Sequence, residues 1–193
     1  MKKLITLLSI FLTTSCSLPM QSPLTSVKDT LPIGSVLQLT QTIIIPADRT
    51  FMYIANGEVK KLKNYNTVDS YQPYCTIHLY KQSSQTRKIE PGDFEVTKIV
   101  EWARDFGYIF NNKNKFSKVE QAGFIKTSMH NDSAVPSTVM YATILSLRST
   151  KQPEVEELVC GYWDEHWKDE FLTLKEMQSA LGGLIVIKSD KNN

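Results

Sequence analysis

The feature that most constrains the fold is an alternation of apolar and polar residues that recurs from Ser35 onward. Successive side chains of a β-strand point to opposite faces, so this period of two is typical of strands. In residues 74–80, for example, Cys75, Ile77 and Leu79 share one face while the intervening residues share the other. Comparable segments are 36–40, 42–45, 51–54, 59–62, 94–100, 139–147 and 184–187.

The connections between these segments are short and carry turn residues. Asn56-Gly57 separates two of the predicted strands and is a strong signal for a tight hairpin. The pattern therefore predicts a β-rich α+β fold, with an antiparallel sheet that is either curled as a barrel or folded as a sandwich.

One helix is expected near the C-terminus. Thr173 and Glu176 have the spacing of a capping box, and Gly182-Gly183 supplies a stop. The apolar residues of this segment form one stripe, which should dock on the sheet. They are Leu174, Met177 and Leu181.

Length and charge limit the class of protein. A chain of 193 residues with 41% hydrophobic residues can form one domain, which we expect to span residues 34–193. The 22 Lys and Arg barely exceed the 20 Asp and Glu, so nothing indicates a nucleic-acid-binding face.

The segment from Arg104 to Ser137 has no clear periodicity. Its aromatic residues are scattered around an Asn/Lys-rich run at 111–115. Two interpretations remain open: an exposed aromatic and basic surface for a partner, or a hairpin whose aromatic residues fill the core.

The N-terminus has the three parts of a secretory signal. Lys2 and Lys3 precede an apolar stretch at 4–12, and small polar residues follow at 13–15. The stretch is far shorter than the roughly 20 residues that span a bilayer. Residues 1–15 are therefore expected to be a signal peptide.

Leu12-Thr13-Thr14-Ser15-Cys16 resembles the lipobox of bacterial lipoproteins. The match lies in the small residues before Cys16, while Leu12 stands one position further out than the leucine of that family. The resemblance implies that the signal is cut before Cys16 and that this residue carries the lipid, including palmitate-type acyl chains. The open alternative is ordinary signal-peptidase cleavage, for example after Ser17, which would discard Cys16.

The resemblance also implies a location. Ser17, rather than Asp, follows the cysteine, and in enteric-type lipoproteins this implies passage to the outer membrane, facing the periplasm. Residues 16–33 contain Pro19, Pro23 and Pro32, so they are expected to form a lipidated N-terminus and an extended tether.

If Cys16 carries lipid, Cys75 and Cys160 remain as an even pair in an oxidising compartment. Each lies in a strand-like segment, and we expect them to form a disulfide. The alternative is two separate buried thiols.

No catalytic constellation is evident. His78, His130 and His166 are scattered, and only His166 has close acidic neighbours, Asp164 and Glu165. No catalytic residue, metal ligand or cofactor is predicted. We expect a non-enzymatic envelope lipoprotein whose β domain binds or supports another envelope component. The alternative is a small periplasmic hydrolase or metal-dependent enzyme that uses the acidic cluster around His166.

Overall fold

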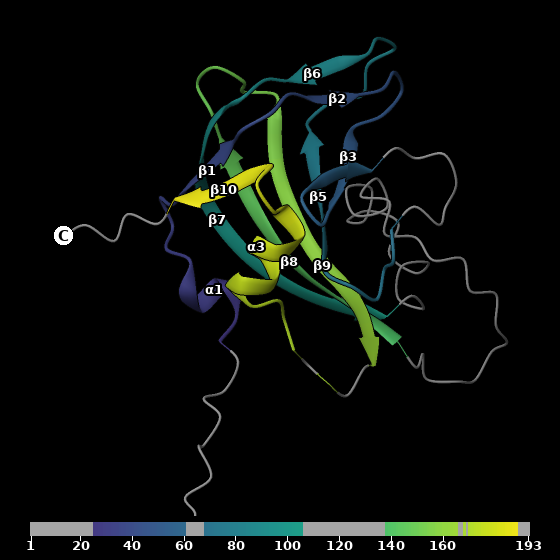
Figure 1. Cartoon of the computed structure of the whole chain (residues 1–193), viewed down its shortest axis with the longest axis vertical. Coiled ribbons are helices and arrows are strands. Elements are labelled where there is room, and N and C mark those ends of the chain that lie inside the picture. The colour runs from purple at the N-terminus through teal and green to yellow at the C-terminus, as the bar shows by residue number, and fades with distance from the viewer. Residues whose placement is uncertain (1–24, 61–67, 106–137, 166–167, 169, 189–193) are drawn as a thin grey trace, which may run out of the picture.

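A curled antiparallel sheet forms the body of the protein. The computed structural model describes residues 25–60, 68–105, 138–165, 168 and 170–188. Eight strands lie in the order β10-β1-β7-β8-β9-β5-β3-β4, and every pairing is antiparallel. Together they form a half-barrel (Figure 1). The bounds are β1 Val36–Leu39, β3 Phe51–Ala55, β4 Glu58–Lys60, β5 Tyr74–Leu79, β7 Gly92–Asp105, β8 Thr138–Arg148, β9 Val155–Glu165 and β10 Ile185–Lys188.

A second, two-stranded sheet lies at one end of the half-barrel (Figure 1). It pairs β2 (Ile43–Ile45) with β6 (Arg87–Ile89). The sequence pattern predicts β2 but not β6, since a three-residue strand with two cationic residues shows no recognisable alternation.

The expected hairpin at Asn56-Gly57 is confirmed. Ala55 pairs with Glu58, and the two residues between them have φ angles of 54° and 75°. Positive φ at both central positions matches the right-handed twist of the flanking strands, and Asn and Gly tolerate it best.

The two faces of the sheet carry separate apolar clusters. The concave face contributes alternate residues such as Met52, Ile77 and Leu145, which are at most 3% exposed. The opposite face carries a second cluster, half of whose members are aromatic, which we call the outer cluster. Its members are Phe51, Tyr53, Ala55, Tyr74, Met140, Ala142, Val159 and Trp163.

Helix α3 (Leu174–Leu181) contacts β3, β5 and β10, so it lies on the concave side of the curled sheet (Figure 1). The expected capping box is confirmed. The backbone N–H of Glu176 donates to the Thr173 side chain at 3.3 Å, and the Thr173 N–H donates to the Glu176 carboxylate at 2.8 Å. Met177 and Leu181 are fully buried, because the apolar stripe faces the sheet.

The N-terminal part of the domain begins earlier than the sequence suggests. Residues 25–33 were expected to be extended, but Val27–Thr30 form a short helix, α1. The Val27 N–H donates to the Leu172 carbonyl at 3.0 Å, and Val27 and Leu31 are 0% and 2% exposed. These two apolar residues stabilise the docked segment, which proline content alone does not reveal.

Several predictions fall outside the described residues. They include the signal peptide, Cys16 and the first part of the tether, together with most of the segment from Arg104 to Ser137. Among the described helices, none is long and apolar enough to cross a membrane.

Candidate functional site

The structure brings the two predicted cysteines together. Cys75 of β5 and Cys160 of β9 are direct cross-strand partners, with their Cα atoms 4.0 Å apart, and they form a disulfide. Both residues are fully buried on the concave face. The predicted bridge is therefore present, and it joins two strands that lie side by side in the middle of the sheet.

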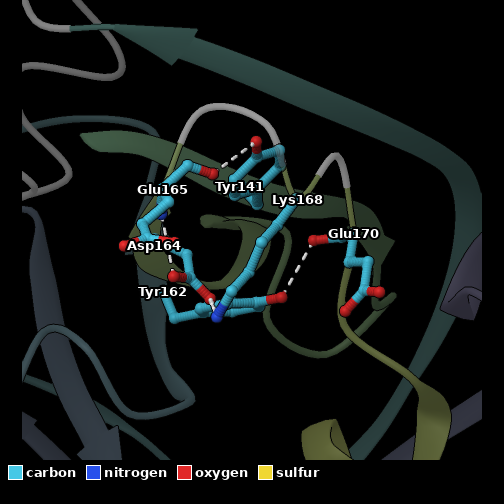
Figure 2. A network of polar contacts seen from close by, with 6 residues as sticks. All are labelled: Tyr141, Tyr162, Asp164, Glu165, Lys168 and Glu170. Atoms are coloured by element: carbon cyan, nitrogen blue, oxygen red, sulfur yellow. Dashed lines mark hydrogen bonds and ion pairs between the residues drawn. The ribbon is translucent and has the colours of Figure 1, made fainter. Parts of the chain in front are cut away.

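The acidic cluster around His166 lies where β9 leaves the sheet (Figure 2). His166 itself is outside the described residues, as is His130, so their place in any site stays a prediction. Asp164, Glu165, Lys168 and Glu170 are described. What these groups bind decides whether they are available for chemistry.

Asp164 is bound on both of its carboxylate oxygens. Lys168 Nζ donates to Oδ2 at 2.8 Å, and the Glu165 backbone N–H donates to Oδ1 at 2.8 Å (Figure 2). The hydrogen bond from Lys168 holds the pKa of Asp164 below its ordinary value, and the same bond raises the pKa of Lys168. A carboxylate with a low pKa is a weak proton acceptor at neutral pH, which makes Asp164 a poor general base.

Two tyrosines fasten the chain that follows β9. Tyr141 OH donates to the Glu165 carbonyl at 3.1 Å, and Tyr162 OH donates to the Glu170 carbonyl at 2.9 Å (Figure 2). Burial, with a smaller contribution from Glu176, Asp164 and Glu170, raises the pKa of Tyr162 to about 12. The Tyr162 hydroxyl group therefore remains a protonated donor at neutral pH. The two hydrogen bonds hold the backbone that leads from β9 toward α3.

The same network offers no obvious metal site. No group of three His, Cys, Asp or Glu residues placed to hold a metal ion occurs in the part of the chain that the structure describes. The carbonyl oxygens of Glu165 and Glu170 already accept hydrogen bonds from the two tyrosines. The hydrogen bonds made by Asp164, Tyr141 and Tyr162 thus fasten the backbone of this loop.

A hydroxyl–imidazole pair was not predicted. Thr76 and His78 lie two residues apart on β5, and Thr76 Oγ1 is 2.8 Å from His78 Nε2. The imidazole also stacks on Phe51, with ring centroids 5.5 Å apart. The sequence carries one signal for this pair, because residues i and i+2 of a strand lie on the same face of the sheet.

This pair has the residue types of a nucleophile and its base, but not the access. Thr76 is 0% exposed and His78 is 4% exposed, both within the outer face of the sheet. A substrate cannot reach a hydroxyl group that is buried in this way. The hydrogen bond instead satisfies two polar groups that would be costly to bury alone.

Comparison with protein-family models, with curated proteins and with solved structures finds no significant match to this chain.

Proposed function

We propose that the chain is a lipoprotein of the bacterial envelope, anchored through Cys16, whose β domain binds another envelope component rather than catalysing a reaction. The observation that supports this most is the buried Cys75–Cys160 disulfide. Disulfides persist in exported proteins and are rare in the reducing cytosol, which agrees with the signal-like N-terminus.

The position of α1 fits an anchored domain. Val27 is the first residue of α1, and only ten residues separate it from Cys16. At about 3.3 Å per residue, such a segment spans at most roughly 35 Å. The α1 end of the domain would then stay close to the bilayer, whereas the opposite end would point away from it.

Lipidation supplies sufficient anchoring energy. Each acyl methylene that enters the membrane contributes about 0.8 kcal/mol, and more than one chain gives stable attachment. The serine at position 17 favours the outer membrane as the destination, with the domain in the periplasm.

The test is a Cys16→Ser variant of the full chain, produced in a Gram-negative host that is fed an alkyne analogue of palmitate. We expect the unchanged chain to carry the label and to fractionate with the outer membrane on a density gradient. The variant should lose the label and appear in the soluble periplasmic fraction. A Cys75→Ala/Cys160→Ala variant is the matched control, because it loses two cysteines but should keep the label.

Two results would contradict the proposal. One is a Cys16→Ser chain that stays membrane-bound and labelled. The other is a mature N-terminus at Leu18, which would show ordinary cleavage after Ser17 and loss of Cys16.

A further inference from the structure

The end of the half-barrel that lies opposite α1 is built from the β2–β6 ribbon and three loops, at residues 46–50, 80–86 and 149–154 (Figure 1). We call this surface the distal end. Hydrogen bonds connect the loops: the Asp48 N–H donates to the Ser83 carbonyl at 2.7 Å, and the Tyr80 N–H donates to the Glu154 carbonyl at 3.0 Å. The loops therefore form one connected surface rather than three independent segments.

A buried glutamine holds the third loop to the ribbon. Gln152 is 9% exposed, and its side-chain amide makes two hydrogen bonds to the backbone of Glu90. The Glu90 N–H donates to Oε1 at 2.7 Å, and Nε2 donates to the Glu90 carbonyl at 2.8 Å. This paired contact fixes the loop before any partner arrives, which lowers the entropy cost of binding.

The distal end is cationic. Five cationic side chains stand there against two acidic ones, Asp48 and Glu154, and a third acidic residue, Glu90, directly follows β6. All five cations are exposed or half-buried. They are Arg49, Lys81, Arg87, Lys88 and Lys151.

None of these five cations takes part in an ion pair that the structure shows among the described residues. The ion pairs among the described residues that the structure shows join Lys60 to Glu58, Arg148 to Glu95, Lys168 to Asp164 and Lys188 to Asp93. The guanidinium of Arg87 donates to the Arg49 carbonyl at 3.0 Å, which positions the loop but neutralises no charge. An excess of positive charge therefore remains to attract an anionic partner.

Apolar side chains are exposed on the same surface. Ile44 of β2 is the cross-strand partner of Lys88 and is 53% exposed, whereas its neighbours Ile43 and Ile45 are fully buried. Tyr80, which begins the second loop, is 61% exposed. Tyrosine and arginine are enriched at the centres of protein interfaces, where they supply much of the binding energy.

We infer that the distal end binds a protein whose contacting surface is acidic and carries an apolar patch for Ile44 and Tyr80. Charge complementarity identifies this class of partner, and the connected loops provide a preformed surface. The inference rests on the proposed function, because anchoring at the α1 end directs the distal end away from the membrane. A lipid surface fits less well, since two apolar side chains are few for insertion into a bilayer.

The test uses the full chain in living cells, with a photo-reactive amino acid placed at position 44. We expect a cross-link to one protein, at a segment rich in Asp and Glu. The Lys81→Glu/Lys88→Glu variant should reduce the cross-link at least about tenfold, because it reverses two charges that face the partner. Lys28→Glu/Lys175→Glu is the matched control, since it makes the same charge change on exposed positions of α1 and α3 and should leave the cross-link unchanged.

Several outcomes would overturn the inference. These are no cross-link, a cross-link that both double variants reduce equally, or a cross-link only to a second copy of this chain. A further such outcome has three parts. The Cys16→Ser chain binds phosphatidylglycerol vesicles, the added Lys81→Glu/Lys88→Glu substitutions abolish this binding, and no cross-link to a protein forms.

Fractionation of the same cells separates this inference from the proposed function. Anchoring without an acidic partner contradicts the inference alone. If the chain is not lipidated but still cross-links to an acidic protein in a charge-dependent way, the result supports binding at the distal end and contradicts the proposed anchor.

Discussion

Gly161 lies where β9 approaches β8 so closely that no side chain fits. A Cβ atom at this position would clash with the Tyr141 carbonyl oxygen and would stand 3.1 Å from the Cα of Ala142. Both contacts are to backbone atoms of the neighbouring strand, so they cannot be relieved by rotation of a side chain. Glycine inside a strand often marks such a close approach or a bend.

We therefore expect Gly161→Ala to lower the free energy of unfolding by about 1–3 kcal/mol, the usual cost of forcing extra volume into a packed site. Urea unfolding followed by circular dichroism measures it. Gly183→Ala is the control, because nothing lies within 4 Å of the Cβ that it would add. Equal stability of the two variants would show that β8 and β9 do not approach closely enough at Gly161 to exclude a Cβ atom.

Single residues also show what the sequence could not reveal about the candidate site. The acidic character of the end of β9 and of the segment that follows it is plain from Asp164, Glu165 and Glu170. That Asp164 binds Lys168, and that Tyr162 binds the Glu170 carbonyl, depends on how the chain turns. The sequence shows which acidic residues are present, but only the geometry shows that the Asp164 carboxylate and the Glu170 carbonyl already have partners.

At the scale of single elements, local signals predicted α3 well. Its cap, its apolar stripe and its glycine stop all lie within a few residues of one another, so no distant contact was needed to recognise it. The strands β5 and β8 were equally clear, because alternation over six or more residues is itself local.

Elements that depend on distant partners were missed. α1 is only four residues long, and it is stabilised by Val27 and Leu31 against residues near α3. β6 exists because Arg87–Ile89 pairs with β2, which is more than forty residues earlier. Short elements gain most of their stability from tertiary contacts, and a sequence window does not contain these.

The cap of α3 gives a prediction at this scale. Thr173→Ala removes the side-chain acceptor of the Glu176 N–H and should lower the free energy of unfolding by about 1 kcal/mol. Ser179→Ala, at an exposed position of the same helix, is the control and should leave stability equal or slightly higher, since alanine favours helix. Chemical unfolding of both variants measures the difference. A Thr173→Ala protein as stable as the control would mean that the capping box contributes nothing.

At the scale of the whole molecule, the sequence left a barrel and a sandwich equally open. The curl depends on pairings such as β1 with both β7 and β10, which join distant parts of the chain. It also depends on the contact between the β3–β4 turn and the end of α3, where the Gly57 N–H donates to the Ala180 carbonyl at 3.0 Å. Both glycines at this contact, Gly57 and Gly182, have positive φ. The helix thus links the two halves of the curled sheet.

The disulfide stabilises this architecture from its centre. Its sequence separation is 85 residues. In the chain-entropy account, closing a loop of that length removes enough freedom from the unfolded state to add up to about 4.5 kcal/mol of stability. β5 and β9 are already neighbours through backbone pairing, so the bridge acts mainly on the unfolded chain.

Unfolding in guanidinium chloride with and without a phosphine reductant tests this account. We expect the reductant to lower the free energy of unfolding by several kcal/mol, with about 4.5 kcal/mol as the upper limit. The Cys75→Ala/Cys160→Ala variant is the control: it should be less stable than the native chain and insensitive to reductant. If reduction leaves the midpoint of the native chain unchanged, the two thiols are not bridged in the protein. A domain that loses this much stability when reduced would be poorly suited to the cytosol, so the same titration bears on where the chain can function.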